Sequence, residues 1–387
     1  MLNPFPAVSA GRQPRAIVRV TSSAGNNPSS VVNQEIDGWI SWEVTNNTYY
    51  EADNFRVSFA TSALPANRDA NWFSTQTQIF VEIIAGFPAD PANPTATESG
   101  MSSLIYGRVD DVELNPVTST LTLTGRDLTA VFIDAKITSI YENQHVSDIV
   151  KHLATSHGLT PVVNGGTDIA GTLYKHSQVR MQADRSEWDL LTWLAREEGL
   201  VCYVVGNELH FEPNPLATGE PYLLYWEPPS TTNGAPASNA IDVSFSRALT
   251  ISKGITVVVR SPSITKKVPV VESYPTKAKA IQAGKAQPFG GVQTYSYTLP
   301  PGRTAVQCQQ YAEQQYRLIV AHEMKVNASM PGDNLLSTKV MLRVQGTRTA
   351  FDQDYFPVDI VRTMSRTEGY RMTVSAKNST PDNEAQS

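Results

Sequence analysis

The chain has 387 residues, of which 41% are hydrophobic and 18% charged, the balance of an ordinary globular protein. This length exceeds what one hydrophobic core usually organises, so two or three domains are expected. The formal net charge of −6 argues against a dedicated nucleic-acid-binding protein, which would present a basic surface. No apolar run reaches the roughly 18 residues that cross a bilayer. Prolines at Pro4 and Pro6 stand where a signal peptide needs an apolar helix, so we expect no secretion by the general route.

Residues 1–134 are predicted to form a first β domain. Apolar and polar residues alternate along three segments, and a period of two places one face of each strand on a core. Turn-rich stretches at 22–30 and 88–99 are expected to be loops. The inward positions are Ile36, Gly38, Ile40, Trp42 and Val44, then Phe55, Val57 and Phe59, then Ile79, Val81 and Ile83.

Residues 135–215 change to helical spacing and are predicted to form a small inserted α/β domain. Helix starts are indicated by capping-box spacing, in which an acid stands three residues after a capping side chain. Helix and strand ends are indicated by glycines. The expected elements are a helix at 146–157 ended by Gly158, a helix beginning at Asp184 or Ser186 and ended by Gly199, and a hairpin turning at Gly206-Asn207.

After a linker at 216–240, the β pattern returns in residues 241–380, the predicted second β domain, for instance as an alternation of Phe356, Val358 and Ile360. A helix is expected at 304–319. The segment 261–302 is rich in proline, glycine and lysine and is expected to be an extended excursion, and 381–387 a disordered tail. The two β domains could be a divergent internal pair, although no repeat aligns residue by residue.

No catalytic motif is recognisable in the sequence. His322-Glu323 lacks the second histidine of a zinc-protease helix, and the glycine loops that bind nucleotides and the serine-nucleophile turn are missing. Adjacent acids such as Asp110-Asp111 point to opposite faces of a strand, whereas a glycosidase needs two carboxylates that face each other across a cleft. We therefore predict no catalytic, cofactor-binding or metal-binding residues, and expect His152 and His157 on a solvated helix surface.

Aromatic residues are frequent in the first β domain, and two interpretations are open. Flat rings could stack on sugars and form a carbohydrate platform. The alternation at Trp42 favours the other interpretation, in which the rings belong to the strand core or to a subunit interface. The residues are Trp39, Trp42, Tyr49, Tyr50, Trp72 and Phe73.

The cysteines and the lysines of the excursion are two further candidates for functional residues. The only cysteines are Cys202, in an expected strand, and Cys308, in an expected helix, and both are predicted to be buried thiols without a disulfide or metal. Lysines in the excursion could contact an acidic neighbour or simply keep a long loop soluble. These lysines are Lys266, Lys267, Lys277, Lys279 and Lys285.

Several stretches follow one another across most of the chain in a specific succession. In the middle of the chain they are Ser139 to Val150 with His157-Gly158-Leu159, and Ser186 to Leu200 followed by a hairpin and preceded by Gln182. Near the ends of the β domains they are Thr122 to Leu128, Tyr355 to Val358 and Gly369 to Val374. In this order the stretches resemble the late control protein D family of phage tail hubs.

The resemblance implies an α+β, mainly β fold with two tail-tube-like β-barrel domains and the small α/β domain inserted between them. Three subunits would form a pseudo-sixfold ring that joins the sixfold tube of a contractile tail to the threefold spike. The implied partners are two further copies of the chain, the spike protein, the tube protein and other baseplate proteins. Genome DNA would pass through the lumen without specific binding.

The expectation from the sequence is therefore a structural baseplate hub protein, not an enzyme and without a cofactor. It would be located in the virion tail and assembled in the cytoplasm of the host bacterium, with no insertion into a membrane. Because the chain ends after the second barrel, the spike would be a separate protein. The alternative is a cell-wall-degrading or carbohydrate-binding module of a tail tip.

Overall fold

A computed structural model describes most of the chain. The expected loops at 22–30 and 88–99, the lysines of the excursion, Gln182 and the tail at 381–387 lie almost wholly outside the described ranges. The structure describes residues 13–22, 34–88, 100–137, 141, 144–166, 169–170, 185–214, 220–229, 234, 236–252, 254–262, 268–275, 293–299 and 301–378.

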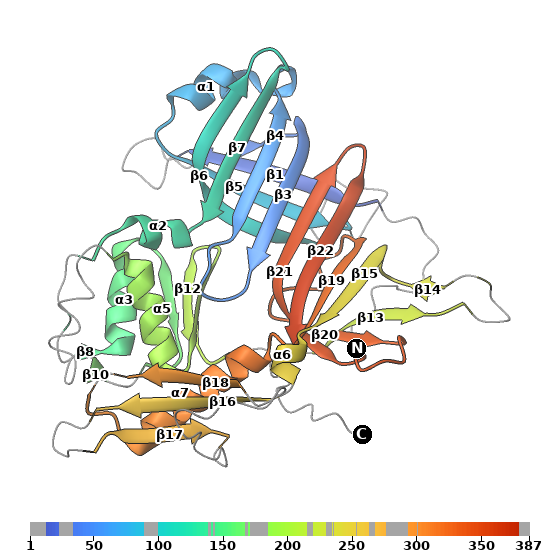
Figure 1. The fold of residues 1–387 in the computed structure, drawn as a ribbon. Coiled ribbons are helices and arrows are strands. Elements are labelled where there is room, and N and C mark those ends of the chain that lie inside the picture. The colour runs from blue at the N-terminus through green and yellow to red at the C-terminus, as the bar shows by residue number, and fades with distance from the viewer. Residues whose placement is uncertain are drawn as a thin grey trace.

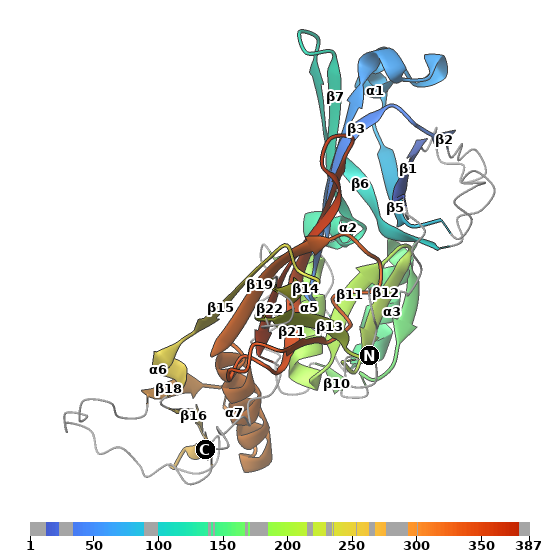
Figure 2. The ribbon, with the colours of Figure 1, turned by 90° about the vertical axis from the view of Figure 1, so that its right-hand side faces the viewer.

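The first β unit is one sheet that folds over on itself around a hydrophobic core (Figures 1 and 2). Strands β3, β4 and β7 form the front layer and β5, β1 and β2 the back layer, and the long strand β6 belongs to both. A β-bulge at Asp110 lies where β6 passes from one layer to the other. The elements are β1 (Arg15–Ser22), β2 (Gln34–Glu35), β3 (Trp39–Asn47), β4 (Asn54–Ala60), the short helices η2 (Thr61–Ala63), η3 (Ala66–Arg68) and α1 (Ala70–Thr75), β5 (Ile79–Gly86), β6 (Met101–Asn115) and β7 (Thr120–Asp127).

The predicted α/β insert follows. Helices α3 and α5 pack on a small sheet with the strand order β11-β12-β9. Ser186 caps α5 and exchanges hydrogen bonds with Asp189, so the predicted capping box is confirmed, and Gly199 and Gly206 adopt the left-handed conformation expected of a helix end and a tight turn. The elements are α2 (Thr129–Asp134), β8 (Gln144–His145), α3 (Val146–Ser156), β9 (Thr160–Val163), β10 (Ile169–Ala170), α5 (Glu187–Glu198), β11 (Val201–Val205) and β12 (Glu208–Glu212).

The second β unit also consists of a front and a back layer around its own core (Figure 2). Its long strand β21 has a bulge at Val358. The prediction that Phe356, Val358 and Ile360 share a face is wrong, because the extra residue shifts the alternation: before the bulge the buried side chain is Tyr355. The elements are β13 (Tyr222–Glu227), β14 (Ala237–Ser238), β15 (Asp242–Arg247), β19 (Met324–Pro331), β20 (Leu342–Gln345), β21 (Asp354–Ser365) and β22 (Gly369–Asn378).

A second small α/β unit lies between β15 and β19 in the sequence, and two of its strands fall inside the expected excursion. Its core is formed by one face of a three-stranded sheet, order β17-β16-β18, and by helix α7, whose N-cap is Thr304. The apolar run at Ile255 thus belongs to this separate sheet and not to the second β unit. The elements are α6 (Leu249–Ser252), β16 (Ile255–Ser261), β17 (Val270–Tyr274), β18 (Gln293–Thr298) and α7 (Ala305–Val320).

The two β units have the same order of strands. From one edge to the other, the first unit runs β3-β4-β7-β6-β5-β1-β2 and the second runs β15-β19-β22-β21-β20-β13-β14. The strands in corresponding places also follow one another in the same sequence along the chain. Neighbours are antiparallel throughout, except that β13 is parallel to β20 whereas β1 is antiparallel to β5. The suspected internal pair is therefore visible as a repeated topology.

The predicted mainly β character is confirmed, and the strands form several sheets. The finer prediction of closed barrels is not supported by the pairing, because no sheet closes within the part of the chain that the structure describes. Instead, the two β units join into one large sheet through strands β3 and β21. In the front layer this gives the continuous order β6-β7-β4-β3-β21-β22-β19-β15 (Figure 1).

Candidate functional site

The joint between the two β units is an antiparallel pairing of β3 with β21. It runs for seven residue pairs, from Asp359 opposite Asn47 to Ser365 opposite Ser41. Strand β3 is the edge of the first unit, so this pairing covers backbone groups that would otherwise be open to another chain. Trp42 of β3 packs against Tyr370 of β22, with ring centroids 5.8 Å apart. The units are thus joined by backbone hydrogen bonds and by a shared apolar contact.

A buried arginine lies beneath this joint. The guanidinium of Arg362 donates to the side-chain oxygen of Asn46 at 2.8 Å and to the carbonyl oxygens of Asp333 and Leu336. Asn46 in turn donates to the carboxylate of Asp53 at 2.8 Å. The network therefore ties β21 of the second unit to the β3–β4 turn of the first. Only 3% of Arg362 is exposed, so its partners replace most of its lost hydration.

Two carboxyl groups at this joint have raised pKa values. Burial raises the pKa of Asp53 to about 6, against hydrogen bonds from Asn46 and Asn47 and the positive charges of Arg362 and Lys339. Burial, reinforced by the charge of Asp53, raises the pKa of Asp127, although Thr129 donates two hydrogen bonds to that carboxyl. The joint is thus sensitive to protonation.

A polar cavity of about 700 Å³ opens beside this network, at the meeting point of both β units and the α/β insert. Its wall includes Asp53, Asp127, Lys339 and Arg362, together with the β11–β12 turn. Their side chains bond mainly to the protein itself. This arrangement is suited to holding three units in a fixed orientation.

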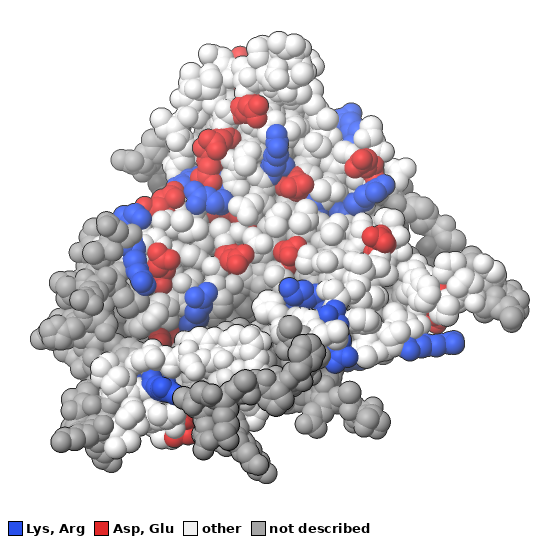
Figure 3. Space-filling model, in the orientation of Figure 1, with Lys and Arg blue, Asp and Glu red and all other residues white. Residues whose placement is uncertain are grey.

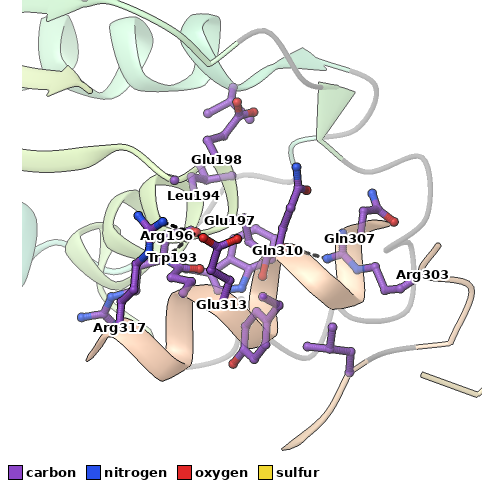
Figure 4. Close-up of a pocket in the computed structure, with 15 residues that line it drawn as sticks. Trp193, Leu194, Arg196, Glu197, Glu198, Arg303, Gln307, Gln310, Glu313 and Arg317 are labelled. Carbon is purple, nitrogen blue, oxygen red and sulfur yellow. Dashed lines mark hydrogen bonds and ion pairs between the residues drawn. The ribbon is translucent and has the colours of Figure 1, made fainter. Parts of the chain in front are cut away.

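A groove of about 530 Å³ separates α5 of the insert from α7 of the second small unit (Figure 4). Glu197 of α5 forms an ion pair with Arg303, just before α7, and Arg317 pairs with Glu313 within α7 at 2.6 Å. Burial raises the pKa of Glu197. The ion pair of Glu197 with Arg303 therefore connects the two small units across the groove.

The outward face of the front layer is polar. Its side chains are mostly small, such as Ser58, Thr124 and Thr373, and acidic and basic residues are interspersed among them (Figure 3). Ion pairs such as that of Arg126 with Asp110, at 2.6 Å, neutralise part of the charge. This face therefore has no large field of one sign that would bind nucleic acid tightly.

The aromatic residues of the first unit are mostly core residues. Trp42 and Phe73 are buried in the core of the unit, with Trp39 and Trp72 packed against it. Tyr49 lies against Tyr203 of the insert, and the hydroxyl of Tyr50 donates to the carbonyl of Leu200. The strand-core interpretation is confirmed for Trp42 and Phe73, and the tyrosines join the first unit to the insert.

His157 and the two cysteines are packed among other side chains of the fold. His157 is part-buried, 2.6 Å from the carboxylate of Glu187 and packed edge-on against Phe132, so the expectation of a solvated surface is wrong for it. No cluster of metal-binding side chains occurs in the described ranges. Cys202 and Cys308 are buried free thiols, as predicted. None of the helices that the structure describes is long and apolar enough to span a membrane.

Comparison with solved structures identifies the fold. The chain matches the tail protein from Neisseria meningitidis MC58 with a TM-score of 0.65 and 13% identity, covering 94% of this chain and 96% of that one. It matches the 43 kDa tail protein of prophage MuSo2 from Shewanella oneidensis with a TM-score of 0.61 and 13% identity, covering 94% and 98%. The chain has the fold of a phage tail protein.

The same fold occurs in a chain of a larger complex. A chain of the Francisella PdpA–VgrG complex matches with a TM-score of 0.57 and 9% identity over 95% of this chain and 58% of that one. No protein-family model matches the sequence, and no curated protein matches it with significance. The predicted resemblance to tail hub proteins is therefore confirmed at the level of the fold.

Proposed function

We propose that this protein is a structural hub of a phage tail baseplate, a member of the late control protein D family located in the virion. Three copies form a ring that joins the sixfold tail tube to the threefold central spike. The chain itself carries out no catalysis and needs no cofactor. In this proposal residue 134 ends the first tube-like domain and residue 215 ends the insert, and the second tube-like domain takes in β13 and β14 from the stretch 216–240.

The observation that carries the proposal is the repeated strand order of two β units joined edge to edge in one chain. A chain with two similar units side by side presents six of them when three copies surround an axis. Closed rings require a heterologous interface that returns to its start after the last copy. The joint between β3 and β21 already shows how one unit can sit beside the next.

The polar outward face supports a pore. In such a ring one face of the front layer lines the lumen, and small neutral side chains with interspersed charges would let DNA pass without binding to it. The tail spike, tail tube and other baseplate proteins are the partners that this architecture calls for. Assembly would take place in the host cytoplasm before the tail is complete.

The test is the mass of the purified protein in solution. Size-exclusion chromatography with light scattering, over a concentration series, should show a species of three times the monomer mass of 42.3 kDa. The fraction of this species should rise with concentration, as mass action requires. A protein that stays monomeric at every concentration, alone and with its tail spike protein, would contradict the ring.

The competing function is a cell-wall-degrading or carbohydrate-binding module. A zymogram on bacterial cell wall distinguishes the two, because the hub proposal predicts no cleared zone. Burial of Trp42 and Phe73 in the core favours the hub, since buried rings cannot stack on a sugar.

A further inference from the structure

Half of strand β6 has an open side. Strand β5 pairs with its residues 101–108, and β7 pairs with the other side from Gly107 to Asn115. Within the described residues, no strand pairs with 109–115 on the side away from β7. An open edge of this length is a template for another strand.

The corresponding half of β21 is occupied. Strands β6 and β21 take the same place in their units, and each has a bulge in its pairing with the strand that follows it, at Asp110 against β7 and at Val358 against β22. Strand β6 has a second bulge, at Leu104, in its pairing with β5. Aligning the bulges makes Asp111 equivalent to Asp359, where the pairing of β21 with β3 begins. The open half of β6 is thus the counterpart of the half of β21 that holds β3.

Strand β15 is the counterpart of β3 and is also open. It pairs with β19 on one side, and nothing described pairs with its other side. The aligned bulges also align β7 with β22, and through them β4 with β19 and β3 with β15. In this alignment Val243 is equivalent to Trp42 and Phe245 is equivalent to Val44. The chain therefore carries both halves of a second joint, at opposite ends of its front layer.

Burial at these positions shows that a neighbour is lacking. Val112 and Leu114 of β6 are 39% and 45% exposed, although their equivalents Ile360 and Arg362 are 0% and 3% exposed. Both lie directly opposite core leucines of β7, so they point to the core face of the sheet and not to the polar face. Covering these valine and leucine side chains with another strand would bury apolar surface that is now exposed to water, which is favourable.

The same difference appears on the other edge. Val44, beneath the formed joint, is fully buried, whereas its equivalent Phe245 is only half-buried and stacks on Phe351 at 5.2 Å. The open half of β6 and the open edge of β15 thus both carry incompletely buried apolar side chains whose equivalents are buried in the β3–β21 joint. Each edge could cover the apolar side chains of the other.

We propose that β15 of one copy pairs antiparallel with the open half of β6 in the next copy, in the register of the β3–β21 joint. This inference rests on the proposed ring and specifies the contact that closes it. In this register Leu114 faces Phe245, Val112 faces Arg247 and Glu113 faces Ser246 of the neighbouring copy. No acidic side chain of β6 stands opposite another acid, so the pairing is free of direct charge repulsion.

Cysteine cross-linking tests this register. The variant carrying Glu113→Cys and Ser246→Cys places thiols directly opposite each other, about 5 Å apart between Cβ atoms, whereas Glu113→Cys with Ser244→Cys places them diagonally, about 7 to 8 Å apart. All three positions are exposed, and the native thiols of Cys202 and Cys308 are buried. Mild oxidation should link the first variant into dimers and trimers on a non-reducing gel, with roughly tenfold less product from the second.

A variant with a charged residue on the open edge of β6 provides a second test of the contact. Leu114→Lys should weaken association by about tenfold or more in light scattering, because it puts an ammonium group opposite Phe245. Leu318→Lys, on α7 and 49% exposed, is the matched control and should associate like the unmodified protein. Thermal unfolding of both monomers should be unchanged, since both side chains are already exposed.

The outcomes separate this contact from the ring itself. A trimer that cross-links equally well through both cysteine pairs, or that tolerates Leu114→Lys, would overturn the β6–β15 pairing and leave the hub function standing. A chain that never oligomerises would overturn both.

Discussion

Arg362 is a charged side chain at an inward position of a β-strand, between Ile360 and Met364. Its hydrogen bonds reach Asn46 of the first β unit and two carbonyls of the second. A buried guanidinium is costly unless it is fully partnered, and removing it leaves its partners buried without a donor. It therefore fixes the angle between the two units as well as contributing to stability.

Replacing this arginine tests that role. Arg362→Met should lower the free energy of unfolding by about 3 kcal/mol, because Asn46 and the carbonyls of Asp333 and Leu336 lose their donor. Urea unfolding followed by circular dichroism measures the loss. Arg371→Met, on the exposed face of the neighbouring strand, is the control and should stay within about 0.5 kcal/mol of the unmodified protein. Equal effects would mean that the network is not important for stability.

Asp53 makes the joint dependent on pH. Its folded pKa of about 6 lies above the ordinary 3.8, so the folded state holds the proton more tightly than the unfolded chain. The resulting stability is fully present below about pH 4 and is lost as the pH rises through 6. The raised pKa of Asp127 has the same sign. Arg362 and Lys339, which face Asp53, limit the effect.

Asp53→Asn removes one of the two titrations. As the pH rises from 4 to 7, the unmodified protein should lose stability relative to this variant, because only the unmodified protein has to ionise the carboxyl group of Asp53. Urea titrations at several pH values measure it. Asp37→Asn, at an exposed carboxyl outside the joint, serves as the matched control for the loss of one carboxyl group. The opposite slope for Asp53→Asn would show that its carboxylate is stabilised in the fold.

Helix α5 illustrates what local sequence decides. Ser186 accepts a hydrogen bond from the backbone N–H of Asp189 at 3.1 Å, and Asp189 accepts one from the backbone N–H of Ser186 at 3.0 Å. Both bonds lie within four residues, so the local sequence alone sets their partners. The helix in turn carries Trp188 and Leu191 into the core of the insert.

Removing this cap should weaken the insert. Ser186→Ala should cost about 1 kcal/mol of unfolding free energy, the usual effect of losing an N-cap side chain. Hydrogen exchange should show faster exchange in the first turn of α5. Ser102→Ala, an exposed strand position on β6, should have no comparable effect. Unchanged exchange in α5 after Ser186→Ala would mean that tertiary packing alone holds the helix end.

At the scale of the whole molecule, the front layer combines a polar outward face with two apolar, incompletely buried edges. The polar face can line a pore and the edges can close a ring. One chain thus contains one completed joint, β3 with β21, and two halves of an equivalent one. Assembly would repeat between copies the contact that folding makes within a copy.

The polar face predicts weak binding to DNA. At about 0.15 M salt the protein should not retard duplex DNA in a gel, because its outward charges are mixed and the net charge is −6. Glu43→Lys combined with Thr373→Lys adds positive charge to this face and should produce salt-sensitive retardation. Strong binding by the unmodified protein would contradict a passive lumen.

The sequence by itself determined the local elements. Period-two alternation located β3, β4 and β5 of the first unit and β21 of the second, but not β1, β6 or β13. The capping box and Gly199 bounded α5, and the two cysteines were correctly expected to be buried. These features depend on residues close together in the chain, where side-chain spacing alone sets the geometry. The resemblance of the middle stretches to a tail hub family was confirmed at the level of the fold.

Only the tertiary structure decided how the units relate. The bulges at Ile40 and Val358 shift the alternation without leaving a clear signal in composition. Ile40, which is 38% exposed, and the face of β21 before its bulge were therefore misassigned. The pairing of β3 with β21 and the hydrogen bond from Arg362 to Asn46 join residues hundreds of positions apart. The repeated strand order also depends on pairings between strands that are not neighbours in the sequence. Strand order depends on which edges meet in space, and different side chains can fill the same core, so a topology can repeat where no residue pattern does.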